Sequence, residues 1–172
     1  TIKVISDDLK IDKKKETKDH NLFEIEALSN KKDFTKLRAE ADSFALKKKF
    51  SDLKIYNKNL PSKISCKTLY DIAEKTRYEL LGCKMLKGIK TNLIKNYLQN
   101  IELKKKNQLK SREDVPLSEA FELYMLKNFL NIKLNSTSSK ILSFWEKDFK
   151  NSFDKHLNYL NKNLENQDLY NS

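Results

Sequence analysis

Glycine and proline are scarce in this 172-residue chain, which contains two of each. Glycine costs a helix about 1 kcal/mol relative to alanine, so a helical chain excludes it wherever the backbone allows. Both glycines, Gly82 and Gly88, lie in one segment at residues 76–93. We therefore predict a mainly helical chain in which the backbone of this segment turns or is closely approached.

Cysteine, histidine and long apolar runs are also scarce, and each shortage excludes a class of protein. Cys66 and Cys83 form no Cys-x-x-Cys pair, and His20 and His156 are remote in sequence, so the compact ligand set of a zinc site is missing. No run of about 18 apolar residues is present, which excludes a membrane-spanning helix. The sequence shows no signal peptide, and we expect a cytoplasmic protein with two reduced, partly buried thiols.

Arginine is rare for a chain with a formal net charge of +11, since only three of its 35 basic residues are Arg. The charge is concentrated in residues 61–110, at about +8, with about +4 before them and about −1 after them. A basic region of this kind is one signature of a nucleic-acid-binding module, although phosphate and guanine recognition favours Arg over Lys. Because a biased genome explains the lysines equally well, nucleic-acid binding is kept as the alternative function.

Catalytic and cofactor motifs are absent from the sequence. A phosphate-binding loop needs four residues between its glycines, then Lys and Ser or Thr, whereas five residues separate Gly82 from Gly88 and Ile89 follows. No Asp-x-Ser-x-Ser string is present to bind magnesium, and two isolated histidines give no base for a Ser or Cys nucleophile. We expect no catalytic residue, cofactor or metal site in this chain. Four carboxylates lie at helical intervals near lysines and are expected on solvated faces: Glu74, Glu79, Glu119 and Glu122.

Apolar spacing predicts a single domain spanning the chain, with a β-containing segment at 1–30 and a helical core at 31–165. Residues 2–5 and 22–28 alternate apolar and polar side chains, which is the period of a half-buried strand. From Asp33 onward the apolar residues recur at helical spacing. The predicted fold class is therefore mainly α, a domain of about five helices with a small N-terminal antiparallel β element.

The predicted helices have recognisable ends. The first is capped by Asp33 and ends before Leu60-Pro61, because the residue before a proline disfavours the helical region. Ser65 caps the second, and a loop at residues 135–139 precedes the last. We expect the inner faces to carry Phe34, Leu37, Ala41, Phe44, Ala45 and Leu53; then Leu69, Ile72, Ala73, Thr76 and Leu80; then Ile89, Leu93, Tyr97 and Ile101; then, after Pro116, Leu117, Phe121, Tyr124, Met125, Leu126 and Phe129; and finally Ile141, Leu142, Trp145, Phe149, Phe153, Leu157, Leu160 and Leu164.

The segment that holds both glycines resembles a known family signature. It is similar to the Arg, Glu, Gly, Met, Gly and Asn-Leu pattern of the CobT subunit of cobaltochelatase, carried here by Arg77, Glu79, Gly82, Met85, Gly88 and Asn92-Leu93. Residues 41–46 look like the family's Ala-Asp-x-x-Ala-Leu segment, and residues 112–120 look like its Arg-x-x-x-Pro-Leu-x-Glu-Ala helix start. Ser51-Asp52 stands where relatives usually have His-Asp. The resemblance extends over residues 1–165.

The resemblance implies a part in aerobic cobalamin biosynthesis, in which an ATP-dependent, ligase-type complex inserts cobalt into a corrin ring. A large subunit holds the corrinoid, an AAA+ ATPase supplies the energy from ATP, and the CobT subunit docks on the ATPase. Such a complex uses ATP, Mg²⁺ and Co²⁺. Full-length members also carry an acidic linker and a C-terminal integrin-like domain, so the resemblance implies that this chain, which starts with Thr rather than Met, is the N-terminal helical region alone.

The role implied for this chain is assembly and coupling rather than bond chemistry. The signature residues Arg77, Glu79, Gly82, Met85, Gly88 and Asn92 are then either contacts to a partner or residues that pack the domain internally. Arg77 and Glu79 are expected to be ion-pair or capping partners. The resemblance leaves homo-oligomer formation open.

Overall fold

The computed structural model describes residues 31–102, 109 and 111–172, so the predicted strands at 2–5 and 22–28 lie outside the described residues. The described part contains eight α-helices, one short 3-10 helix and no strand. The mainly helical class is confirmed, and the prediction of about five helices is wrong. The elements in chain order are α2 (Lys31–Phe50), α3 (Leu53–Lys58), α4 (Ile64–Met85), α5 (Lys87–Glu102), η3 (Arg112–Asp114), α6 (Leu117–Phe129), α7 (Ser136–Ser143), α8 (Glu146–Lys162) and α9 (Gln167–Asn171).

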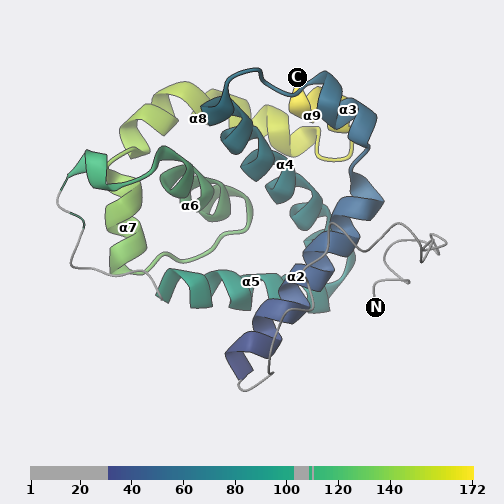
Figure 1. Ribbon diagram of the computed structural model, residues 1–172, viewed down its shortest axis with the longest axis horizontal. Coiled ribbons are helices and arrows are strands. Elements are labelled where there is room, and N and C mark those ends of the chain that lie inside the picture. Colours follow the sequence, from purple (N-terminus) through teal and green to yellow (C-terminus); the bar gives the residue numbers. More distant parts are fainter. Residues whose placement is uncertain (1–30, 103–108, 110) are drawn as a thin grey trace.

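Helix α6 lies at the centre of the fold, with α4, α5, α7 and α8 around it (Figure 1). It packs against α4, α7 and α8, while α2 packs against α4 and α5, and the short helices α3 and α9 pack against each other. The central position follows from its composition, since most of its side chains are apolar and are stabilised by burial. Its buried residues are Ala120, Phe121, Leu123, Tyr124, Met125 and Leu126.

The first predicted helix is interrupted after Phe50 because Asp52 starts a new one. The Asp52 carboxylate accepts a hydrogen bond from the Lys54 amide at 2.7 Å, which is the bond of an N-cap. The predicted inner face of this stretch is wrong in part, because Phe34 and Leu53 are 51% and 69% exposed, although the predicted Ala45 is buried. The buried face of α2 consists instead of Ala39, Asp42, Ala45 and Leu46.

The last predicted helix is divided in the same way. The Asn135 side chain accepts a hydrogen bond from the Ser138 amide at 2.8 Å and caps α7, so most of the predicted loop at residues 135–139 is helical. Helix α8 then begins after Trp145. Of the aromatic residues on the predicted inner face, Phe149 is 3% exposed, its ring lies 5.7 Å from that of Phe121, centroid to centroid, and Trp145 and Phe153 are partly buried against the core.

Two further caps were predicted at the wrong residue. Helix α2 begins at Lys31, which places Asp33 inside it, and α4 begins at Ile64 with Lys63 as the N-cap residue instead of Ser65. The inner face of the third predicted helix is confirmed in full. All four of its residues are buried in α5: Ile89, Leu93, Tyr97 and Ile101.

Candidate functional site: the junction of α4 and α5

The predicted site residues lie around the junction of α4 and α5. Helix α4 runs through Gly82 to Met85, and α5 begins after a single extended residue, Leu86, with φ −138° and ψ 119°. The Leu86 amide donates to the Gly82 carbonyl at 2.9 Å, which closes the last turn of α4. Neither glycine has a positive φ. The predicted turn is therefore present, but a residue with ordinary backbone angles makes it.

The two glycines differ in what surrounds them. A Cβ atom on Gly82 would lie 2.4 Å from both Cδ atoms of Leu46, whose side chain is fully buried. Helix α2 thus approaches α4 closely at Gly82, as the sequence predicted. A Cβ atom on Gly88 would have no neighbour within 4 Å, so the described residues give no packing reason for glycine there.

Glu79 joins three helices from inside the core. Its carboxylate accepts a hydrogen bond at 2.6 Å from Ser43 Oγ of α2 and another at 2.6 Å from the Tyr97 hydroxyl of α5. Glu79 itself is 1% exposed, and a buried carboxylate is tolerated only where hydrogen bonds replace water. The expectation that Glu79 lies on a solvated face is therefore wrong, and this side chain links α2 and α5 to α4.

The buried environment of Glu79 changes its proton affinity. Burial raises the pKa of the carboxyl above its usual value, while the Lys75 ammonium and the hydroxyl groups of Ser43 and Tyr97 oppose that rise. Burial, followed by the Glu79 charge, also raises the pKa of the Tyr97 hydroxyl well above its usual value. Lys75 lies 5.2 Å from the centre of the Tyr97 ring. The tyrosine consequently remains a hydrogen-bond donor at neutral pH.

Asn92 adds a second polar link between α5 and α2. Its amide Nδ2 donates to Asp42 Oδ2 at 2.7 Å, and Asp42 is 3% exposed. Asp42 belongs to the stretch at residues 41–46 that resembles the second family motif. The structure therefore brings Asn92, Glu79 and Gly82 together against one stretch of α2.

Arg77 is buried in an ion pair with Glu74, one turn earlier on α4. Its Nε and Nη2 atoms donate to the two Glu74 carboxylate oxygens at 2.8 and 2.9 Å. Nη1 also donates to the Leu164 carbonyl at 2.9 Å, and Nη2 to the Phe50 carbonyl at 2.5 Å. Ser51, where the sequence departs from the family pattern, donates to Glu74 Oε1 at 2.5 Å. One guanidinium thus holds the end of α2 and the chain after α8 onto α4.

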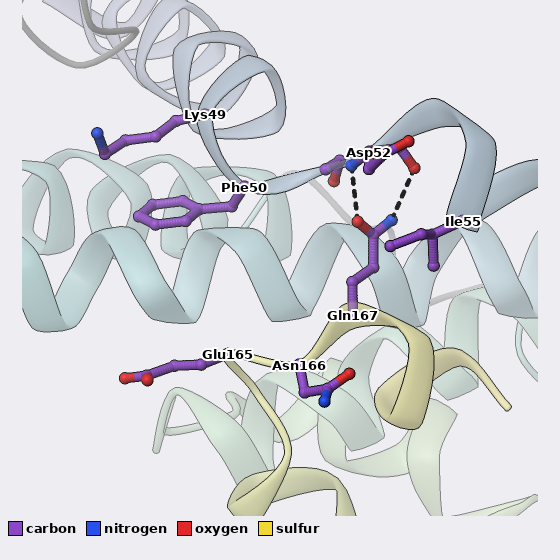
Figure 2. Close-up of a pocket in the computed structure, with 8 residues that line it drawn as sticks. Lys49, Phe50, Asp52, Ile55, Glu165, Asn166 and Gln167 are labelled. Carbon is purple, nitrogen blue, oxygen red and sulfur yellow. Dashed lines mark hydrogen bonds between the residues drawn. The ribbon is translucent and has the colours of Figure 1, made fainter.

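An open groove of about 650 Å³ lies next to this ion pair, between the end of α2 and the start of α9 (Figure 2). The Gln167 amide crosses it, accepting from the Asp52 amide at 2.6 Å and donating to the Asp52 carbonyl at 3.2 Å. These bonds join two segments that are distant in sequence, so the groove is a seam between them. Its lining consists of Lys49, Phe50, Ser51, Asp52, Ile55, Glu165, Asn166 and Gln167.

Met85 and Gly88 are separate from the buried set. Met85 is 40% exposed, its neighbour Leu86 is 43% exposed, and Gly88 is exposed as well. Lysines with exposed side chains surround them at Lys84 and Lys87. The six predicted site residues therefore divide into an inward group of Arg77, Glu79, Gly82 and Asn92, and an outward group of Met85 and Gly88.

The part of the chain that the structure describes holds no cluster of three or more His, Cys, Asp or Glu side chains that could bind a metal ion. Cys66 is exposed and Cys83 is half-buried, so the prediction of partly buried thiols holds for Cys83 alone. Burial raises the pKa of the Cys83 thiol to about 11. In the same residues, no helix combines the length and the apolar character that crossing a membrane requires.

The sequence did not identify the partners of the inward group. Glu74 was expected on a solvated face, yet it is 2% exposed. The spacing of Glu74 and Arg77 by three residues, with one of only three arginines in the chain, was the available signal for the ion pair. Ser43 and Asp42 carried no such signal, because they meet residues that are 36 and 50 positions away.

Comparison with known proteins agrees with the resemblance. A family model described as cobalamin biosynthesis protein CobT matches residues 8–172. No solved structure matches the chain.

Proposed function

Because the chain belongs to the CobT family of cobalamin biosynthesis proteins, we propose that it is a non-catalytic assembly and coupling part of an ATP-dependent cobaltochelatase. In this proposal the complex works in the cytoplasm and inserts cobalt into a corrin ring. The chain docks on an AAA+ ATPase subunit and couples this subunit to a large subunit that holds the corrinoid. ATP and Mg²⁺ act elsewhere in the complex, and Co²⁺ is the metal that the complex inserts.

The observation that carries the proposal is that the charged residues of the signature are buried and bonded within the fold. Arg77 and Glu79 are each 1% exposed, and their polar atoms are engaged by side chains and carbonyls of other segments. A group that touches a substrate needs an approach from solvent, and these groups have none. Their arrangement supports a role as the frame that holds α2, α4 and α5 together, which leaves the outward residues of the segment for a partner.

Nucleic-acid binding, the alternative from the sequence, has less support. Of the three arginines, Arg77 is buried, and Arg112 donates to Asp148 at 2.7 Å and stacks on the Trp145 ring at 3.7 Å. Arg is the side chain that reads phosphates and guanine bidentately. The described residues therefore leave Arg38 as the one arginine with an exposed side chain and no such engagement.

The test is a binding and activity measurement with purified subunits. The chain is mixed with the ATPase subunit, with ATP and Mg²⁺ present, and the molar mass of the mixture is measured by size-exclusion chromatography with light scattering. We expect a complex of defined stoichiometry. We also expect no cobalt insertion, followed by the corrin absorbance, when the chain is the only protein present. Failure to form the complex, or insertion by the chain alone, would refute the proposed role.

A further inference from the structure

We propose that the outward side of the α4–α5 junction is a docking surface for an acidic protein segment anchored by apolar side chains. This surface, called here the α5 outer face, consists of Lys84, Met85, Leu86, Lys87, Gly88, Lys90, Thr91, Lys95 and Leu98, all of them exposed. The inference deepens the proposed function, on which it relies for the first partner to be tested.

Helical periodicity makes this face continuous. The buried residues of α5 recur every four positions from Ile89 to Ile101 and occupy one side of the helix. Gly88 and Lys95 lie on the opposite side, with Thr91 and Leu98 next to them and Lys87 at the edge of the same face. At 1.5 Å per residue, the distance along the helix from the first to the last of these positions is about 16 Å. This length is sufficient for several turns of a partner helix or for an extended segment.

The charge of the face has a single sign. Between Leu80 and Ile101 the sequence contains four lysines and no Asp or Glu. Among the described residues, none of these four lysines forms an ion pair with a carboxylate, whereas Lys58 and Lys127 elsewhere pair at 2.8 and 2.9 Å. Neighbouring like charges on a helix repel each other. A partner that supplies carboxylates would remove this repulsion and would be steered to the face.

Apolar side chains and a bare backbone lie among these lysines. Met85, Leu86 and Leu98 are 40%, 43% and 37% exposed, and flexible Met side chains are common at binding surfaces. Gly88 exposes its backbone without a packing reason inside the chain, since a Cβ there would meet no atom within 4 Å. A glycine on a helix surface allows a second backbone to come close. The face therefore offers apolar anchors and a shallow point of approach in addition to charge.

The same composition favours a protein over a nucleic acid as the occupant. The α5 outer face contains no arginine and no aromatic side chain, which are the groups that bind phosphates bidentately and stack on bases. Exposed Met and Leu side chains gain little from a phosphate backbone, but they can fill pockets of a protein surface. We therefore assign the face to an acidic protein segment.

The experiment measures binding of the whole chain to the ATPase subunit by fluorescence anisotropy, with variants on and off the face. Lys87→Glu/Lys95→Glu and Gly88→Leu are expected to weaken binding by about tenfold or more, through charge reversal and through blocked approach. The matched control is Lys147→Glu/Lys155→Glu on α8, which changes the net charge equally at exposed positions on the other side of the molecule (Figure 1). Circular dichroism verifies that each variant is folded. Tight binding that the face variants leave unchanged would overturn the inference while the proposed function stands.

A second arm decides the case if the unaltered chain does not bind the ATPase, which would refute the proposed function. Isotope-labelled chain is titrated with a synthetic amphipathic helix of Glu and Leu, with the same helix carrying Gln for Glu, and with duplex DNA, and amide shifts are followed by NMR. Amide shifts at residues 84–98 that appear with the Glu helix, and not with the Gln helix or the DNA, support the docking surface. No shifts there, equal shifts with the Gln helix, or larger shifts with DNA overturn it. Self-association abolished by Lys87→Glu/Lys95→Glu would assign the face to a second copy of the chain and overturn the inference as well.

Discussion

Replacing Arg77 by methionine removes the central bond of the buried ion pair and should destabilise the fold strongly. Methionine has a similar length and fits an apolar site, but it carries no charge and no donor. Glu74, at 2% exposure, would stay in the core without its ion-pair partner, and among the described residues Ser51 would be its remaining side-chain donor. The carbonyls of Phe50 and Leu164 would each lose the bond that Arg77 gives them.

The expected loss follows from the cost of a buried charge without its partner. Removing one member of a buried ion pair costs about 3–5 kcal/mol. For a domain of this size each kcal/mol lowers the melting temperature by about 2–4 °C, so Arg77→Met should melt about 6–20 °C below the unaltered chain. Arg77→Lys should fall between the two proteins, because a lysine keeps the charge but cannot make two parallel bonds to Glu74 and also reach both carbonyls.

The assay is urea unfolding followed by circular dichroism, with two comparisons that isolate the ion pair. Glu74→Leu/Arg77→Met should be more stable than Arg77→Met, since it removes the stranded carboxylate as well. Lys58→Met breaks an exposed pair with Asp168 at 2.8 Å and should cost far less stability than Arg77→Met, because solvent screens the pair. A cost below about 1 kcal/mol for Arg77→Met, or a double variant less stable than Arg77→Met, would refute the reasoning.

Replacing each glycine by alanine should change the free energy of unfolding in opposite directions. Gly82→Ala forces a Cβ against the buried Leu46 and should lower it by about 1–3 kcal/mol. Gly88→Ala should raise it by about 0.5–1 kcal/mol through helix propensity. Thermal melts of both variants check this, and equal signs would contradict the packing described. Glu79→Gln tests the buried carboxyl through pH. Because the folded-state pKa of Glu79 is raised, its contribution to stability is greatest below the unfolded-state pKa and is lost as pH rises through the folded-state value. The stability of the unaltered chain relative to Glu79→Gln should therefore fall from about pH 4 upward, and a constant or rising difference would argue against it.

Helix faces could be predicted from sequence where large apolar residues alone define them. The four buried residues of α5 are an example, because nothing polar competes for that face. The buried face of α2 could not be predicted in this way, since its core positions hold Asp42 and small alanines while Phe34 is exposed. A polar residue faces the core there because Asn92 of another helix satisfies it. Hydrophobic spacing within one helix does not contain that information.

The candidate site could be predicted in part, for a related reason. The resemblance selected Arg77, Glu79, Gly82 and Asn92, and the structure brings them to the contacts of α4 and α5 with the segments around them. Their partners come from positions tens of residues away, as in the bond between Ser43 and Glu79. Such pairs depend on how helices cross, which is set by packing of the whole core. Side-chain caps that begin a new helix, as Asp52 does for α3, were also weaker signals than the apolar period they interrupt.

The division of the signature segment into inward and outward residues makes the packing and docking explanations separable. Gly82 contacts Leu46, so substitutions there act on stability first and on binding as a consequence of unfolding. Gly88 and Met85 contribute little to the core, so Gly88→Leu should not lower the melting temperature while binding falls. If the whole segment served internal packing alone, stability and binding would change together at both glycines. Measuring melting temperature and partner affinity for Gly82→Ala and Gly88→Leu side by side therefore distinguishes a segment that only packs from one that also docks.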